Sequence, residues 1–378
     1  METKLLLADY EYLYEALLKH PLLLEDEKRK QLEQIYENLK ERVLDETTLI
    51  NAMTTLTMLF EDGHTNIELP YTKEDLCLRL PCRWSGEKLV LCENYLQIEA
   101  GAEIIAVDGM EQKEIFAWLG TRIPHENAYL VNSRTIEYPY QNYHMFSGRN
   151  LAQLFGEKDS YEVTFLAEGQ KRTVQCPLVT YDGFLDFPEG EFVSYEVQGD
   201  TAVLHLDQCV CDDRYKEALT QLATLCRENQ IKKLELDLSK NMGGSSAVID
   251  EFIKYVDVDT FRRYEMIDYS SGDPQVVTRR SDRIQNPKKD VLFPKKIVCR
   301  VSNTTFSSAR TFAVTLKDNG IATIIGEPTG GKPCSYGMPR KDKTPNYNIR
   351  FRVSRCLFLR PDESLDEELA LCPNDREV

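Results

Sequence analysis

The stretch Val301-Ser302-Asn303-Thr304-Thr305-Phe306-Ser307-Ser308-Ala309-Arg310 joins a predicted strand to a predicted helix. The apolar run over 296–301 predicts a buried strand. The helix is expected over about 308–317, because Asn319-Gly320 follows and Gly commonly stands just past a helix end. A second apolar strand, 321–325, and a Gly-rich turn complete a strand–helix–strand unit.

Ser307 stands at this junction, where a serine serves either of two purposes. The amide N–H groups in the first turn of a helix lack intrahelical partners and stabilise an oxyanion beside a reactive hydroxyl. Alternatively, Ser307 or Ser308 only caps the helix, since serine is a favoured N-cap residue. The stretch alone favours the cap, and the rest of the chain has to decide.

The chain has 378 residues, enough for two or three domains, and a net charge of −16. The acidic balance argues against non-specific nucleic-acid binding, which needs basic surfaces. No apolar run approaches the length of a membrane span, and the N-terminal sequence lacks a signal-peptide pattern, so we expect a cytoplasmic protein. The 11 cysteines are scattered without a C-x-x-C pair, which indicates reduced thiols and no zinc site.

The N-terminal residues 1–65 are expected to form a helical subdomain. Apolar side chains recur at helical spacing in two segments, and Pro21 separates the first helix from the second. The last of these helices ends before Asp62-Gly63-His64-Thr65, which precedes a short strand at 67–69. Among five histidines, His64 is the one carried on a polar loop, where functional groups are often found.

Residues 66–190 are expected to form a β-rich module. Residues 102–107 predict a strand that ends in the turn Asp108-Gly109, and a short helix is expected over 112–119. Residues 161–166 and 171–176 predict a hairpin. The segment 123–156 has no clear period, so we interpret it as a linker or as the wall of a binding cleft.

Residues 191–378 alternate between strands and helices. Strands are expected over 202–206 and 233–238, with helices over 215–228 and about 247–255. This alternation predicts a mostly parallel sheet covered by helices. Between strand and helix lies the Gly-rich turn Asn241-Met242-Gly243-Gly244-Ser245-Ser246, whose backbone N–H groups are open to a ligand.

Three stretches occur together in an order that resembles the S41 serine peptidases, the family of C-terminal processing and tricorn-type proteases. They are Asp62-Gly63-His64-Thr65, then the segment 236–244, then Thr305-Phe306-Ser307-Ser308-Ala309 followed by Gly326-Glu327-Pro328-Thr329-Gly330-Gly331-Lys332. Residues 101–110 also resemble the core of the PDZ-like module of that family. The resemblance implies a ClpP/crotonase-like βα core and hydrolysis of peptide bonds.

The resemblance implies that Ser307 is the nucleophile. The chemistry of the chain agrees with it: the turn at Gly243 and Gly244 is expected to supply one oxyanion donor, and the amide N–H of Ser308 the other.

The resemblance implies two alternative candidates for the general base. In C-terminal processing proteases a lysine activates the serine, and Lys332 matches it, but Tyr336 and Arg310 stand where that subfamily has glutamine and glutamate. In tricorn-type members a histidine is the base, and His64 matches it, although Gly63 stands where their pattern has serine. We favour His64 because histidine needs less pKa tuning than a lysine amine. An acidic residue near the C-terminus completes the tricorn-type arrangement, and Asp362 or Glu363 falls in the right region.

The sequence therefore predicts a serine peptidase acting on peptides or unfolded chains. A catalytically silent relative that binds peptides or small apolar ligands is the alternative, and an acyl-CoA enzyme of the crotonase fold is a third. No metal or organic cofactor is called for. We expect no nucleic-acid partner, and assembly into a homo-oligomer stays open.

Overall fold

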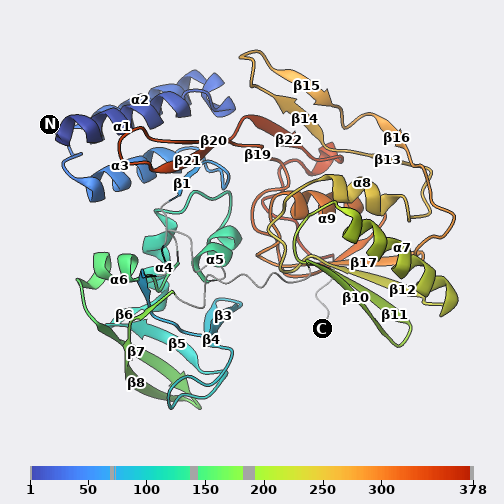
Figure 1. Ribbon diagram of the computed structural model, residues 1–378, viewed down its shortest axis with the longest axis horizontal. Coiled ribbons are helices and arrows are strands. Elements are labelled where there is room, and N and C mark those ends of the chain that lie inside the picture. The colour runs from blue at the N-terminus through green and yellow to red at the C-terminus, as the bar shows by residue number, and fades with distance from the viewer. Residues whose placement is uncertain (1, 69–71, 73, 137–143, 182–191, 375–378) are drawn as a thin grey trace.

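The computed structural model describes residues 2–68, 72, 74–136, 144–181 and 192–374. Three buried hydrophobic clusters organise these residues: one around the N-terminal helices, one in a β-rich middle part and one around a central sheet near the C-terminus. Figure 1 shows the three parts arranged around the middle of the molecule. The described helices include none that is both long and apolar enough to cross a membrane.

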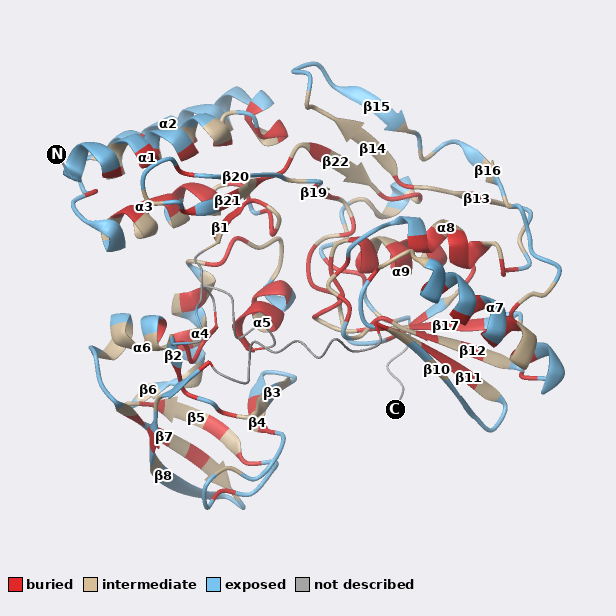
Figure 2. Cartoon of the chain, in the orientation of Figure 1, coloured by how far each residue is buried: buried red, intermediate tan, exposed pale blue. Residues whose placement is uncertain are grey.

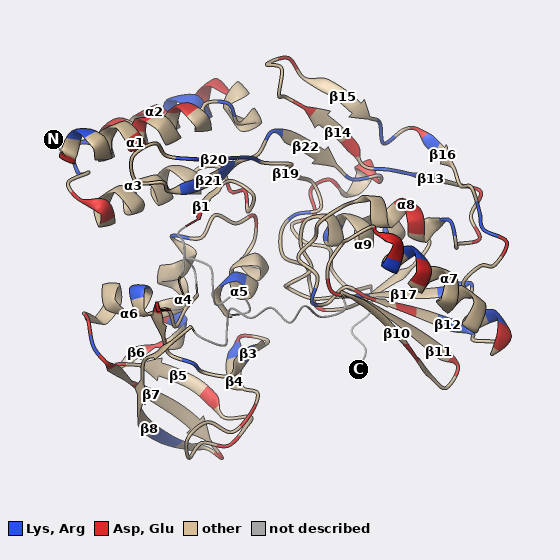
Figure 3. Cartoon of the chain, viewed as in Figure 1, with Lys and Arg blue, Asp and Glu red and all other residues tan. Residues whose placement is uncertain are grey.

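The N-terminal part consists of α1 (Glu2–Leu17), the 3₁₀ helix η1 (Pro21–Leu24), α2 (Asp26–Lys40) and α3 (Glu46–Met58). A three-stranded antiparallel sheet completes it, in the order β1 (Asn66–Glu68), β21 (Arg350–Val353), β20 (Arg340–Lys343). A segment from near the C-terminus thus packs on the N-terminal helices. Figure 3 shows basic residues following β20 and β21, and Arg352 pairs there with Glu68.

The middle part is built on the antiparallel sheet β3-β4-β5-β7-β8, with β6 paired to β5. Its strands are β3 (Cys82–Ser85), β4 (Lys88–Leu91), β5 (Glu103–Val107), β6 (Met110–Glu111), β7 (Ser160–Ala167) and β8 (Gln170–Pro177), and the pair β2 (Leu76–Cys77) and β9 (Val179–Thr180) lies apart from it. The predicted hairpin and the helix α4 (Gln112–Gly120) are both present.

Two further helices occur where the sequence showed no period. They are α5 (Ala128–Ile136) and α6 (Gly148–Phe155), and the intervening residues 137–143 lie outside the described part of the chain. Leu130 and Val131 of α5 are buried. The interpretation of 123–156 as a mere linker is therefore wrong for these two segments, whose short helices are defined by tertiary burial more than by a repeating pattern.

The C-terminal part contains the five-stranded sheet β10-β11-β12-β17-β18. β10 (Val193–Gln198) pairs antiparallel with β11 (Thr201–Leu206), whereas β11, β12 (Lys233–Asp237), β17 (Lys296–Val301) and β18 (Thr323–Gly326) run parallel. The helices α7 (Asp213–Glu228), α8 (Ala247–Ile253) and α9 (Ser308–Asp318) connect or follow these strands. Figure 2 shows buried residues concentrated along the strands and on α8. The prediction of a mixed α/β fold with N-terminal helices is confirmed.

The remaining strands form a β-structure that the sequence did not indicate. A four-stranded sheet has the order β15 (Gln275–Thr278), β14 (Glu265–Asp268), β22 (Cys356–Leu359), β19 (Ser335–Gly337), and β13 (Thr260–Arg262) pairs with β16 (Arg283–Gln285). A 3₁₀ helix, η2 (Glu363–Leu365), follows β22. This sheet borders the cavity that contains Ser307, because Tyr336 and Gly337 of β19 line that cavity.

Candidate active site

Ser307 immediately precedes α9 and has a strained backbone. Its φ is 52° and its ψ is −126°, in a region that non-glycine residues rarely adopt, at a cost of about 1–3 kcal/mol. Its side chain makes no capping hydrogen bond to the helix. The hydroxyl is therefore presented away from the helix end, so the simple capping role considered from the sequence does not describe Ser307.

His64 lies beside Ser307. The two side chains belong to the loop after α3 and to the start of α9, and the distance from His64 Nε2 to Ser307 Oγ is 3.0 Å. The imidazole ring stacks on Phe306, with 4.7 Å between ring centroids, and the side chain is 13% exposed. This separation is within the reach that a general base requires.

Asp62 is fully buried on the other side of the imidazole ring. Its Oδ1 accepts the backbone N–H of His64 at 2.9 Å and lies 3.5 Å from His64 Nδ1. Its Oδ2 accepts the hydroxyl of Thr65 at 2.6 Å and faces Nε2 of His20 at 3.3 Å. His64 Nδ1 makes no hydrogen bond in this state, so a small closing movement is needed to align it with the carboxylate.

The surroundings of Asp62 keep it ionised. Burial opposes ionisation, but the His20 and His64 rings together hold the pKa of this carboxyl well below its usual value. An ionised Asp62 accepts hydrogen bonds and cannot donate one, so it favours the proton of a neutral His64 on Nδ1. Nε2 then carries the lone pair that faces Ser307.

A glycine turn passes close to the nucleophile. Gly243 (φ 109°) has no room for a side chain, because a Cβ there would lie 2.7 Å from Ser307 Cβ and 2.9 Å from Ser308 N. The N–H of Gly243 donates to Asn241 Oδ1 at 2.8 Å. Within the described part of the chain, no hydrogen bond involves the N–H of Gly244 or of Ser308. These two N–H groups are therefore available to hydrogen-bond a ligand.

A cavity of about 660 Å³ contains this group of residues. His64, Gly244, Ser307 and Ser308 line it beside apolar side chains contributed by α8 and by the four-stranded sheet, namely Ile249, Met266 and Phe358. Its size and its mixture of polar and apolar walls are typical of a ligand-binding site.

Glu126 and Arg134, from the segment that the sequence left without structure, brace the loop before His64. Glu126 accepts the N–H of Gly63 at 3.2 Å, and Arg134 donates to the carbonyl oxygen of Gly63 at 2.8 Å. Glu126 is also paired with the buried Arg310 at 3.1 Å. A Cβ on Gly63 would lie 2.7 Å from the side chain of Leu130 and 2.9 Å from that of Phe306, so the serine of the tricorn-type pattern would require these side chains to move.

Lys332 lies apart from the nucleophile. Its backbone N–H donates to Glu126 at 3.2 Å, and its side chain lines a neighbouring pocket of about 270 Å³ with Glu25 and Glu61. The residues around the cavity of Ser307 do not include Lys332. Among the described residues, the side chain that contacts the Ser307 hydroxyl is therefore that of His64.

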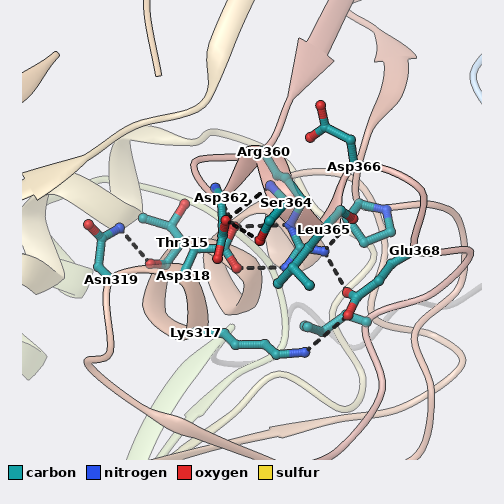
Figure 4. A network of polar contacts seen from close by, with 12 residues as sticks. Thr315, Lys317, Asp318, Asn319, Arg360, Asp362, Ser364, Leu365, Asp366 and Glu368 are labelled. Atoms are coloured by element: carbon teal, nitrogen blue, oxygen red, sulfur yellow. Dashed lines mark hydrogen bonds and ion pairs between the residues drawn. The ribbon is translucent and has the colours of Figure 1, made fainter. Parts of the chain in front are cut away.

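The structure does not bring Asp362 or Glu363 to His64. Asp362 caps η2 by accepting hydrogen bonds from Ser364, and Glu363 is 81% exposed and pairs with Arg280. Figure 4 shows the cause: the buried Arg360 pairs with Asp318 at the last residue of α9. Ser307 stands at the opposite end of that helix, roughly 15 Å away at 1.5 Å per residue.

One set of possible metal ligands was found among the described residues. Asp62, His64 and Glu126 each offer a ligand atom, and these atoms lie within 4.8 Å of one another. Each of the three has protein partners already: Asp62 has Thr65 and His20, His64 has Ser307, and Glu126 has Arg310. The set fits a hydrogen-bonded site better than a metal centre.

Comparisons with known proteins relate part of this chain to a peptidase family. Residues 200–353 match the sequence profile of peptidase family S41. This part of the chain belongs to peptidase family S41. A search of curated proteins gave no match for the sequence.

Solved structures resemble this chain over almost its whole length. Mature CPAF complexed with lactacystin matches with a TM-score of 0.70 and 15% identity, covering 98% of this chain and 93% of that one. The photosystem II D1 C-terminal processing protease matches with a TM-score of 0.52 and 15% identity, covering 98% and 92%. The tricorn protease matches with a TM-score of 0.39 and 13% identity, covering 98% and 34%. At these identities the likeness to CPAF and to the D1 protease concerns the fold.

Proposed function

We propose that this chain is a serine peptidase that hydrolyses peptide bonds through an acyl-enzyme, with Ser307 as nucleophile and His64 as general base. The observation that carries the proposal is the 3.0 Å approach of His64 Nε2 to Ser307 Oγ, with the ionised and buried Asp62 on the other side of the ring. The S41 match supplies the reaction class.

In the first half of the reaction, His64 Nε2 takes the proton from Ser307 as Oγ attacks the carbonyl carbon of the scissile peptide bond. Asp62 stabilises the imidazolium that forms. We assign the amide N–H groups of Gly244 and Ser308 as donors to the oxyanion, since the N–H of Gly243 is already occupied by Asn241. His64 then gives its proton to the leaving amine, which departs and leaves the acyl-enzyme.

In the second half, water attacks the acyl-enzyme. His64 accepts a proton from the water, the tetrahedral oxyanion occupies the same two donors, and the proton returns to Ser307 Oγ as the carboxylic acid product leaves. The residues proposed here differ from the sequence expectation in one role: the acid behind the histidine is Asp62, in place of Asp362 or Glu363.

The finer fold assignment is part of the same proposal. The parallel strands β11, β12, β17 and β18 with their connecting helices support a ClpP/crotonase-like core over 191–378. The strand β5, its Asp108-Gly109 turn and α4 support a PDZ-like module within 66–190. Substrates are then peptides or unfolded chains, of which a protein C-terminus, as named for the D1 protease, is one kind.

Digestion of an unfolded protein tests the function directly. Purified wild-type chain is incubated with reduced casein, and new peptide termini are counted by mass spectrometry. We expect cleavage by the wild type and by Ser364→Ala, which alters an exposed serine far from the cavity, and none by Ser307→Ala. Equal cleavage by Ser307→Ala would contradict the proposal, and no cleavage by the wild type would favour the catalytically silent peptide-binding alternative.

A further inference from the structure

His20, which comes from the N-terminal helices, lies directly behind the proposed catalytic acid. Its side chain is fully buried, and its Nε2 lies 3.3 Å from Asp62 Oδ2. With Asp62, His64 and Ser307 it completes a continuous line of polar contacts from the N-terminal helical part to the nucleophile.

The other ring nitrogen of His20 defines where its proton lies. The backbone N–H of Leu22 points at His20 Nδ1 from 3.1 Å, as part of the cap of η1. An amide N–H can only donate, so Nδ1 must carry a lone pair. The ring proton is then on Nε2, which donates to the carboxylate of Asp62.

Aromatic contacts hold the His20 ring in this orientation. Its centroid lies 4.5 Å from that of Phe60 and 4.7 Å from that of Tyr336, which meets it edge-on. Phe60 is close to Asp62 in the chain, and Tyr336 lines the cavity of Ser307. The ring cannot turn without displacing residues of the site.

The contacts of Asp62 show what this donor accomplishes. Oδ2 is occupied by His20 and Thr65, so Oδ1 is the oxygen that remains for His64. Glu126 also lies close to Asp62 and His64, where Arg310 balances its charge, and the guanidinium of Arg134 contacts the neighbouring Gly63.

We propose that His20 is a positioning residue: as a neutral Nε2–H donor it fixes the orientation of Asp62, and through Asp62 it fixes the tautomer and the ring plane of His64. This inference rests on the proposed function. It also makes the N-terminal helical part a component of the active site.

Two substitutions separate the donor role from the structural role. His20→Gln places an amide nitrogen near the position of Nε2 and can still donate to Asp62, but it loses the acceptor for Leu22. His20→Asn places an amide oxygen near the position of Nδ1 and keeps that cap, but it loses the donor. If His20 only caps η1, His20→Asn should react faster than His20→Gln. If His20 positions Asp62, His20→Gln should react faster.

The readout is the second-order rate of covalent reaction with a serine-directed fluorophosphonate, followed from pH 5 to pH 9. We expect His20→Asn to react about 10- to 100-fold more slowly than the wild type, the usual effect of one hydrogen bond to a charged group. His20→Gln should recover most of that loss. The acid limb of the profile should move to higher pH in His20→Asn, because a carboxylate with fewer donors attracts the imidazolium of His64 more strongly.

Two results would overturn the role of His20 while leaving the peptidase intact. One is a reactive wild type with His20→Asn at least as fast as His20→Gln. The other is an acid limb in His20→Asn that stays in place or moves to lower pH. No reaction of the wild type would refute the proposed function, and the role of His20 with it. A measurement on the unmodified chain does not depend on how the variants fold: ¹⁵N spectra of histidine-labelled protein should show His20 protonated on Nε2 alone, and a proton on Nδ1 would refute the inference.

Discussion

Replacing Asp62 by asparagine tests the arrangement behind His64 most specifically. The two side chains have the same shape, but asparagine is neutral and one of its terminal atoms is a donor. Asp62 is surrounded by donors: the hydroxyl of Thr65, Nε2 of His20, and the backbone N–H and Nδ1 of His64. An amide group therefore meets a donor in either orientation.

The expected loss of activity in Asp62→Asn follows from these two orientations of the amide. With its nitrogen at the position of Oδ1, the amide faces both donors of His64, so the wrong tautomer of the base is favoured. With its nitrogen at the position of Oδ2, it faces His20, and His64 keeps a neutral acceptor without the charge that stabilises its imidazolium. Loss of the acid in a Ser-His-Asp triad lowers kcat by about 10⁴-fold, and we expect a fall of about 10³- to 10⁴-fold here. One lost hydrogen bond to the charged group costs about 1.5–3 kcal/mol of stability.

The difference in unfolding free energy between wild type and Asp62→Asn should depend on pH. The pKa of Asp62 is held well below its reference value of 3.8, so its stabilising contribution is complete above that pH and is lost as the pH falls toward the folded-state pKa. The gap in unfolding free energy between wild type and Asp62→Asn should therefore narrow below pH 3.8. Urea unfolding at a series of pH values measures it.

Asp362→Asn is the matched control. Its Oδ1 accepts two hydrogen bonds from Ser364, which an amide oxygen also accepts, so cleavage of casein should change by no more than about twofold, as for an ordinary surface substitution. Full activity in Asp62→Asn together with a large loss in Asp362→Asn would refute the assignment of Asp62 and favour the acid expected from the sequence.

Three further predictions concern the base, the glycine turn and the C-terminal network. His64→Ala should lower turnover by at least about 10²-fold and Lys332→Ala by much less, as steady-state peptide hydrolysis would show, and full activity in His64→Ala would remove it as the base. Gly244→Ala should lose both activity and about 1–3 kcal/mol of stability, because its φ of 137° and a nearby backbone carbonyl exclude a side chain; a wild-type melting temperature would contradict this. Arg360→Met should cost about 3–5 kcal/mol by leaving the buried Asp318 unpaired, measured by urea unfolding, whereas its activity per folded molecule should be unchanged.

Local sequence patterns predicted the elements that carry the nucleophile. The strand β17 occupies Lys296–Val301 as expected, and α9 begins at Ser308. These elements have strong local signals: a continuous apolar run, a polar turn, and Asn319-Gly320 as a stop. The approach of His64 to Ser307, proposed on the resemblance, is also present in the structure.

The parts that sequence reasoning missed depend on contacts between distant segments. Glu126 and Arg134 come from a region without a hydrophobic period, and their role appears only when they enclose Gly63. Asp62 lies within the motif Asp62-Gly63-His64-Thr65, but the family resemblance pointed to the C-terminal acids, which the buried Arg360–Asp318 pair holds at the far end of α9. No local pattern pointed to His20, because its partner Asp62 is 42 residues away in the sequence.

The packing of residues 340–353 against the N-terminal helices could not be predicted from the sequence either. Strands β20 and β21 are short, and the pairing of β21 with β1 spans most of the chain. Ile349 and Phe351 become part of the N-terminal hydrophobic cluster only through this pairing. Such long-range strand pairing leaves no periodic pattern in a sequence.

The central claim is that Ser307 is an activated nucleophile. The most direct measurement is reaction of the folded chain with a fluorophosphonate, followed by peptide mapping to locate the adduct. The account predicts a single adduct on Ser307, which is absent from Ser307→Ala and strongly slowed in His64→Ala. No adduct, or an adduct on another serine that persists in Ser307→Ala, would contradict it.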